Sequence, residues 1–275
     1  MSPPEISPSP SAAAPLASYE VGAGARGGVL LHGFLGSGPN LRTLAQRWQE
    51  REPHLRLLIP DLRGHGRSPP LPETDTGATL ALLAADVLAA ARAADLPAPF
   101  RLVGHSLGGR VALAAARIAP ASITDVVLLD IAPGPIDPTV SESRRVLEVL
   151  LAAPPAAANR RELRAFLIAR GLSLALADWL LMNLATEPGR VHWAIDRQAL
   201  ERFHDQSMRE DLWDVIAAHQ VPVRCIRGAR SRYVTDADLA RLEAEGCRTD
   251  TLADAGHFIH VEALPALLDL LTGAD

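Results

Sequence analysis

The sequence has few cysteines, no long apolar run and no excess of basic charge. Only two of its 275 residues are cysteine, Cys225 and Cys247, which is too few for a disulfide framework. No apolar run reaches the length that a bilayer-spanning helix needs. The formal net charge of −5 argues against nucleic acid or an anionic membrane surface as a partner. A soluble globular protein remains, and a hydrophobic content of 48% supplies ample core.

The N-terminal stretch also lacks recognisable targeting features. It reads MSPPEISPSPSAAAPLASYE, without the basic and apolar regions of a secretory signal and without the arginines of a mitochondrial transit peptide. We therefore expect residues 1–15 to form a disordered tail rich in Pro, Ser and Ala. The expected location is cytoplasmic.

A strand, a sharp turn and a helix follow one another in residues 99–116, PFRLVGHSLGGRVALAAA. Ser106 falls on the turn, in the arrangement called a nucleophile elbow. Gly104 and Gly108 are small residues placed where the chain must fold back tightly. A bare G-x-S-x-G pattern is common by chance, so the remainder of the chain must support the interpretation.

Apolar strands alternate with helical patterns along most of the chain. Because each strand is apolar on both faces, the alternation predicts βαβ units and a mostly parallel, doubly wound α/β sheet. The predicted strands are Gly27–Leu31, Leu55–Ile59, Phe100–Val103, Ile123–Leu129, Val221–Arg227 and Arg248–Leu252.

The alternation stops in the middle of the chain, where only helical patterns appear. We expect an all-helical insertion of residues 135–216 between two core segments, residues 16–134 and 217–275. The insertion leaves the sheet after the carboxyl end of a strand, where ligand crevices of α/β folds open, so we expect a cap over the site. Thr139 and Glu142 have capping-box spacing and predict the start of its first helix.

Two further segments follow predicted strands and should open on the same sheet edge as Ser106. His32-Gly33-Phe34 resembles the HG-x loop of α/β-hydrolases, and on that correspondence the backbone N–H groups of Phe34 and Leu107 would stabilise an oxyanion. His257 follows the last predicted strand, as the base should in a Ser…acid…His order. A serine needs such an imidazole to take its proton.

The sequence offers two places for the acid that would act with Ser106 and His257. Most α/β-hydrolases carry Asp after the penultimate core strand, but here that position holds Ser231, which cannot carry the required charge. Asp236 and Asp238 lie a little beyond, in a pattern typical of a helix cap. Asp130 ends the strand that should adjoin the strand of Ser106, and we favour Asp130.

Six motifs carry a resemblance to a known superfamily: LLHGFLGS, DLRGHGRS, GHSLGGRVAL, LLDIAP, RGARSRYV and AGHFIHVE. Together they resemble the α/β-hydrolase superfamily over about residues 28–134 and 220–271. More narrowly, they resemble its small-esterase branch, in which the acid follows the sixth strand in a D-I-x-P motif. The resemblance implies an α/β-hydrolase fold that hydrolyses small carboxylic esters or thioesters. It implies Ser106 as nucleophile, Asp130 as acid and His257 as base.

The expected partner is a small-molecule ester. We expect no metal and no organic cofactor, because no His/Cys cluster has ligand spacing and no G-x-G-x-x-G follows a strand. We also expect a monomer or homodimer without nucleic-acid or membrane partners. Four residues near the site positions are expected to contribute to substrate binding: His32, His105, Ile131 and Phe258.

Other functions on the same fold remain open. The motifs HGFLGS and GGR also resemble the α/β-hydrolase lyase of menaquinone synthesis, in which Arg110 would bind an acidic substrate rather than lie exposed on a helix. Carbon–carbon hydrolases and cofactor-free perhydrolases share the same triad. A non-catalytic ligand receptor is a further alternative, and it would not turn over any activated ester.

Overall fold

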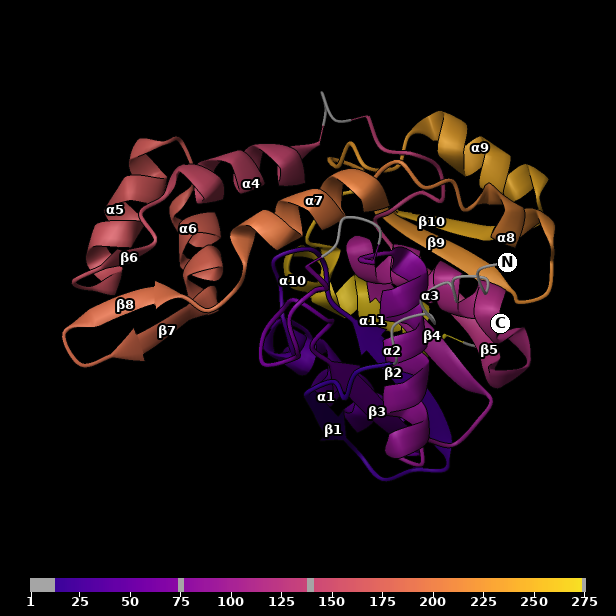
Figure 1. The fold of residues 1–275 in the computed structure, drawn as a ribbon. Helices are drawn as coiled ribbons and strands as arrows, with labels where there is room; N and C mark the ends of the chain where they lie inside the picture. Colours follow the sequence, from indigo (N-terminus) through magenta and orange to yellow (C-terminus); the bar gives the residue numbers. More distant parts are fainter. Residues whose placement is uncertain (1–12, 74–76, 138–140, 274–275) are drawn as a thin grey trace, which may run out of the picture.

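A seven-stranded sheet forms the centre of the computed structural model, which describes residues 13–73, 77–137 and 141–273 (Figure 1). The strand order is β1-β3-β2-β4-β5-β9-β10, and neighbouring strands are parallel except for β1 with β3. The strands are β1 (Ser18–Val21), β2 (Arg26–Leu31), β3 (Leu55–Pro60), β4 (Phe100–His105), β5 (Ile123–Leu129), β9 (Val223–Gly228) and β10 (Arg248–Leu252). The six predicted strands and the mostly parallel sheet are thereby confirmed, whereas β1 was not predicted.

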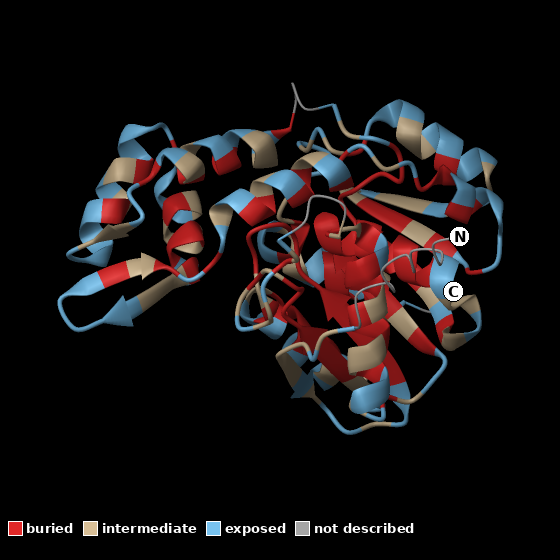
Figure 2. Cartoon of the chain, viewed as in Figure 1, coloured by how far each residue is buried: buried red, intermediate tan, exposed pale blue. Residues whose placement is uncertain are grey.

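Helices cover both faces of the sheet and bury its apolar side chains (Figure 2). Along β5, Val126 and Leu128 pack into the core under α2 and α3, whereas Val127 and Leu129 pack into the core under α1 and α11. This alternation explains why the strand reads as an unbroken apolar run. The helices of this core are α1 (Arg42–Arg51), α2 (Leu80–Ala93), α3 (Leu107–Ile118), α8 (Trp213–Ala217), α9 (Asp236–Ala244), α10 (Ile259–Glu262) and α11 (Leu264–Thr272).

The segment between β5 and β9 is not all helical, contrary to the sequence prediction. Its strands form a three-stranded antiparallel sheet of order β6-β8-β7, and a hairpin turn at Gly189, with φ of +78°, joins two of them. In Figure 1, α5, α6 and this sheet project from the core, while α4 and α7 run toward it. The elements are α4 (Glu142–Ala152), β6 (Ala156–Ala157), α5 (Arg160–Ala169), α6 (Leu174–Leu180), β7 (Leu184–Glu187), β8 (Arg190–Trp193) and α7 (Arg197–Ser207).

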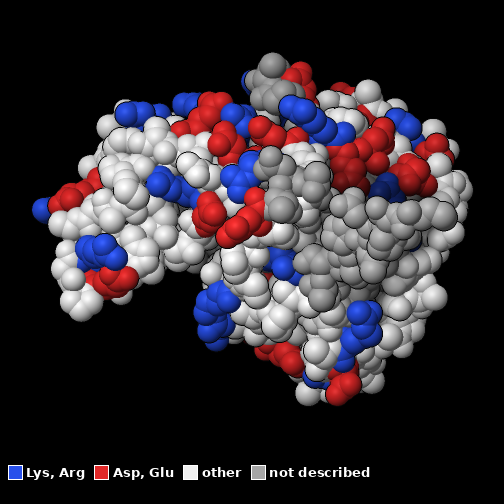
Figure 3. Space-filling model, viewed as in Figure 1, with Lys and Arg blue, Asp and Glu red and all other residues white. Residues whose placement is uncertain are grey.

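Side chains of opposite charge connect α4 to α7. Arg144 on α4 forms ion pairs with Glu148 on the same helix and with Glu201 and Asp205 on α7. Figure 3 shows basic and acidic side chains interspersed on the visible face. None of the helices in the described ranges combines the length and apolar character required to cross a membrane.

Two sequence predictions fall at the limits of the described residues. Most of the expected tail, residues 1–12, lies outside them, and the backbone N–H of Ala14 donates to Asp86 at 2.7 Å. Thr139 also lies outside the described residues. Helix α4 begins at Glu142, and the Ser141 hydroxyl accepts a hydrogen bond from the backbone N–H of Arg144.

Candidate active site

Ser106 lies on a strained turn between β4 and α3. Its φ of +52° and ψ of −118° are rarely adopted by a residue with a side chain, and its neighbours explain how the turn is accommodated. A Cβ at Gly104 would lie 2.3 Å from the carbonyl carbon of Gly108, and one at Gly108 would lie 2.3 Å from the carbonyl oxygen of Leu31. The two glycines are therefore required by close backbone approach.

The imidazole of His257 binds the carboxylate of Asp130. The distance from Nδ1 of His257 to Oδ2 of Asp130 is 2.7 Å. Because a carboxylate oxygen accepts, Nδ1 carries the proton, and Nε2 is left as the basic nitrogen of the neutral ring. The Asp130 side chain is fully buried and that of His257 is 12% exposed.

Two further donors hold the Asp130 carboxylate. The backbone N–H of Gly228 donates to Oδ1 at 2.9 Å, and the Ser231 hydroxyl donates to Oδ2. Ser231 occupies the position at which most α/β-hydrolases carry the acid. It contacts the carboxylate that comes from β5 instead.

The two alternative acids have other partners. Asp236 is 92% exposed and forms an ion pair with Arg227. Asp238 forms a capping box with Thr235 at the start of α9. The structure brings Asp130, and neither of these residues, to hydrogen-bonding distance of His257.

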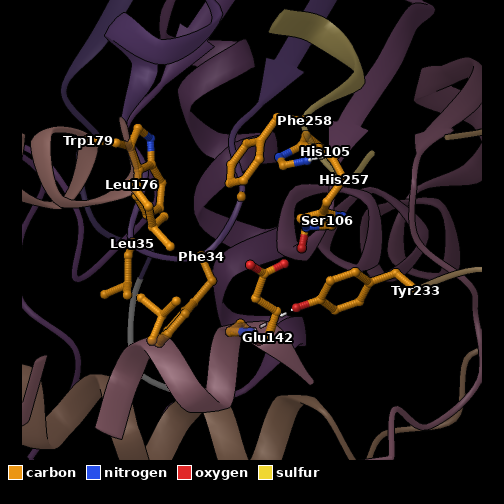
Figure 4. A pocket seen from close by; sticks show the side chains of 13 residues that line it. Phe34, Leu35, His105, Ser106, Glu142, Leu176, Trp179, Tyr233, His257 and Phe258 are labelled. Carbon is orange, nitrogen blue, oxygen red and sulfur yellow. Dashed lines mark hydrogen bonds between the residues drawn. The ribbon is translucent and has the colours of Figure 1, made fainter. Parts of the chain in front are cut away.

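Ser106 and His257 line one pocket (Figure 4). The pocket encloses about 460 Å³ of empty space, including space open to solvent. Loops at the carboxyl edge of the sheet supply part of its wall, and α4 and α6 supply the part that faces Ser106. The other lining residues are Gly33, Phe34, Leu35, His105, Glu142, Ser143, Val146, Leu176, Trp179, Tyr233 and Phe258.

The four residues expected to bind substrate divide into two pairs. His105 and Phe258 line the pocket, whereas His32 and Ile131 do not belong to its lining. His32 connects two loops behind the pocket, since its Nε2 accepts from the N–H of Leu62 at 2.9 Å and its Nδ1 donates to the carbonyl of Gly33 at 2.8 Å. Ile131 is fully buried. Neither residue belongs to the pocket lining, and their role in substrate binding stays a prediction.

Burial keeps three histidines of the core neutral near neutral pH. It lowers the pKa of His32 to about 4 and that of His260 to about 4, and with the neighbouring imidazoles it lowers the pKa of His105 well below its usual value. The Nε2–H of His105 donates to the carbonyl of His257 at 2.9 Å. This bond fixes the backbone that carries the candidate base.

The expected oxyanion donors lie on the loop after β2 and at the start of α3. Leu107 is the first residue of α3, where backbone N–H groups have no acceptor within the helix. Phe34 lines the pocket on the loop after β2. Their role as donors stays a prediction.

Arg110 is neither exposed nor part of the pocket. Its guanidinium is fully buried and donates to carbonyl groups at both ends of the inserted segment, including Gly134 at 2.7 Å and Ser207 at 3.1 Å. Burial lowers its pKa to about 10. Arg110 therefore cannot bind an acidic substrate in the manner of the lyase alternative.

The sequence interpretation missed Tyr233. Its ring stacks on the His257 imidazole, with centroids 4.0 Å apart and an interplanar angle of 26°. Its hydroxyl accepts a hydrogen bond from the backbone N–H of Ser143 at 2.9 Å. The RGARSRYV motif contains Tyr233, but only the fold shows that it packs on the imidazole.

Within the described parts of the chain, no three His, Cys, Asp or Glu side chains form a group that could hold a metal ion. The absence of a metal or organic cofactor stays a prediction.

Residues 29–270 match the model of the alpha/beta hydrolase family. The chain is 27% identical over 240 residues to the sn-1-specific diacylglycerol lipase ABHD11 of Xenopus laevis, covering 85% of this chain and 74% of the relative. It is 27% identical over 243 residues to esterase YbfF of Escherichia coli strain K12, covering 87% and 89% of the two chains.

A solved structure with a similar fold is titled marine microorganism esterase. It has a TM-score of 0.81 and 25% sequence identity, over 94% of this chain and 98% of that chain. The family match over most of the chain agrees with the sheet order and the strained serine turn. The chain belongs to the alpha/beta hydrolase family.

Proposed function

We propose that the protein is a serine carboxylic ester hydrolase that works through an acyl-enzyme. The observation that carries the proposal is that Ser106, on its strained turn, and His257, bound to the buried Asp130, line one pocket. The esterases and lipases among the relatives support the same reaction class. Esters and thioesters both present the carbonyl that this chemistry requires.

The proposed reaction begins with attack of the Ser106 hydroxyl oxygen on the ester carbonyl, while Nε2 of His257 takes the hydroxyl proton. The negative charge that develops on the carbonyl oxygen is stabilised by the N–H groups of Phe34 and Leu107, each contributing about 3 kcal/mol. His257 then gives its proton to the leaving alcohol oxygen. Water repeats the sequence on the acyl-enzyme and releases the acid.

Asp130 is proposed as the acid of the triad. Its charge orients the His257 ring and stabilises the imidazolium that forms during each half of the reaction. The hydrogen bonds from Gly228 and Ser231 hold the carboxylate in position. An acid after β5 also supports assignment to the small-esterase branch, in which the D-I-x-P motif carries it.

The inserted segment is proposed to act as a cap. Val146 of α4 and both Leu176 and Trp179 of α6 line the pocket opposite the loops of the core. These apolar side chains favour an apolar acyl or alcohol group and exclude water from the ester.

A series of p-nitrophenyl esters tests the proposal. We expect the wild type to hydrolyse the acetate, butyrate or octanoate ester, and Ser106→Ala and His257→Gln each to lose at least about 10⁴-fold in kcat. Ser122→Ala, outside the pocket, is the matched control and should retain wild-type activity. Absence of hydrolysis across the series, or hydrolysis that survives in Ser106→Ala, would exclude the proposed mechanism and would favour a receptor or another reaction.

A further inference from the structure

The pocket in front of Ser106 contains one carboxylate and no guanidinium group. Glu142 is the acidic residue in its lining, and no arginine belongs to that lining among the described residues. This is notable because the chain has 27 basic residues, all of them arginine. The histidines beside Ser106 are His257 and His105, and burial keeps His105 neutral.

The side chain of Glu142 points into the pocket. An acidic residue at the start of a helix stabilises the helix end, so its position as the first residue of α4 has an independent structural reason. That reason does not account for its direction. Figure 4 shows the carboxylate directed into the pocket, on the side of Ser106. Within the described chain, no hydrogen-bond donor or cation is paired with it.

Four aromatic rings line the same space: Phe34, Trp179, Tyr233 and Phe258. The whole chain has only five Phe, four Trp and two Tyr, so more than a third of its aromatic residues gather here. Trp179 and Phe258 contact each other across the boundary between the inserted segment and the core, with centroids 5.8 Å apart. The face of an aromatic ring carries partial negative charge and attracts a cation within about 6 Å.

We propose that Glu142 and these four rings form a subsite for an ammonium group, so that esters carrying a positive charge are preferred substrates. The proposal rests on the proposed ester hydrolysis. A quaternary ammonium needs no hydrogen-bond acceptor and has an apolar surface, which suits an aromatic wall with one carboxylate. A carboxylate on the substrate would instead be repelled by the charge of Glu142.

Two isosteric esters test the charge preference directly. Butyrylcholine carries a trimethylammonium group, and tert-butylethyl butyrate replaces its nitrogen with carbon at nearly the same volume. We expect the wild-type kcat/KM to be higher for butyrylcholine by about fivefold or more, and the ratio to fall to about one in Glu142→Gln. The butyrate ester of hydroxybutanoic acid carries a carboxylate and should have the lowest kcat/KM of the three esters. In Glu142→Gln, its kcat/KM should rise relative to that of the neutral ester.

The matched control is Glu148→Gln. Glu148 lies on the same helix but pairs with Arg144 and does not line the pocket. This variant should keep the wild-type ratio. A ratio near one in the wild type, or an unchanged ratio in Glu142→Gln, would overturn the inference.

Binding separates this inference from the proposed function. Calorimetry on Ser106→Ala compares the affinities of the two esters without turnover, and we expect tighter binding of butyrylcholine that depends on Glu142. If the wild type hydrolyses neither of these esters nor any ester of the p-nitrophenyl series, ester hydrolysis is wrong and the binding preference alone decides the subsite. If the neutral ester is hydrolysed through Ser106 with no preference in turnover or binding, the subsite is wrong and ester hydrolysis stands.

Discussion

Nδ1 of His257 lies 2.7 Å from Oδ2 of Asp130, although the two residues are 127 positions apart in the chain. The contact joins the end of β5 to the loop after β10, across the end of the intervening strand β9. A donor at Nδ1 fixes the tautomer in which Nε2 is basic. The proposed reaction depends on this relationship.

Replacing Asp130 with Asn should lower kcat for an activated ester by about 10⁴-fold, because the amide cannot stabilise the imidazolium and can favour the wrong tautomer. The p-nitrophenyl butyrate assay near neutral pH measures this change. Asp236→Asn and Asp238→Asn are the controls, since both carboxylates are bound elsewhere. A severe loss in Asp236→Asn together with a mild one in Asp130→Asn would show that the acid has been misassigned.

Ser231→Ala should reduce kcat by about tenfold, because the variant removes one hydrogen bond to a buried carboxylate. Ser231→Thr keeps the hydroxyl and should restore most of the activity. Measuring kcat and KM separately checks the reason for the loss, since Ser231 does not line the pocket and KM should change little. An effect confined to KM would contradict a role through Asp130.

Arg110→Met should lower the free energy of unfolding by about 3 kcal/mol, because several buried carbonyl groups lose their donor. These carbonyls include Gly134 before the inserted segment and Ser207 at its end. Urea denaturation measures the change. Arg117→Met is the matched control, because Arg117 lies on the same helix but forms partly exposed ion pairs, which contribute about 0–1 kcal/mol. Equal losses in the two variants would contradict the structural role of Arg110.

Acid should destabilise the fold through His65. Burial lowers its pKa to about 3, whereas an unfolded histidine titrates near 6.5. Between these values the unfolded chain binds a proton that the folded chain does not. The free energy of unfolding is therefore retained above about pH 6.5 and decreases as the pH falls toward 3.

As the pH falls from 7 to 5, His65 alone should lower the free energy of unfolding by about 2 kcal/mol. Urea denaturation measures the free energy of unfolding at both pH values. Between pH 7 and pH 5 it should fall by about 2 kcal/mol less in His65→Asn than in the wild type. His219→Asn, which removes an exposed imidazole, is the control. If His65→Asn and the wild type show the same pH dependence, His65 does not couple folding to acid.

The sequence predicted the parts of the fold whose causes are local. Each central strand is apolar on both faces and is bounded by turn residues, so its position follows from the residues themselves. Ser106 was predicted to lie on a strand-to-helix turn because small residues flank it at the required spacing. The structure confirms that turn and the parallel strands around it.

The inserted segment was only partly predicted, because its strands depend on tertiary pairing. β6 consists of Ala156 and Ala157, residues with no preference for a strand, and they pair with β8. Pro188-Gly189 is a turn signal that could have indicated the β7–β8 hairpin. The surrounding Ala and Leu residues favoured a helical interpretation instead.

Contacts between distant segments were beyond prediction from local patterns. Arg110 reads as an ordinary helix residue, yet it binds the carbonyl of Ser207, which is 97 positions away. The stacking of Tyr233 on His257 and the direction of Glu142 into the pocket likewise depend on how the loops and the inserted segment pack.

Covalent labelling of the nucleophile tests the central claim most directly. Diethyl p-nitrophenyl phosphate transfers its phosphoryl group to a serine activated by an adjacent base, and mass spectrometry of the digested protein locates the adduct. We predict one adduct, on the peptide that contains Ser106, and a rate at least about 10³-fold lower in His257→Gln. An adduct on another residue, or equal labelling rates in the wild type and His257→Gln, would contradict the account.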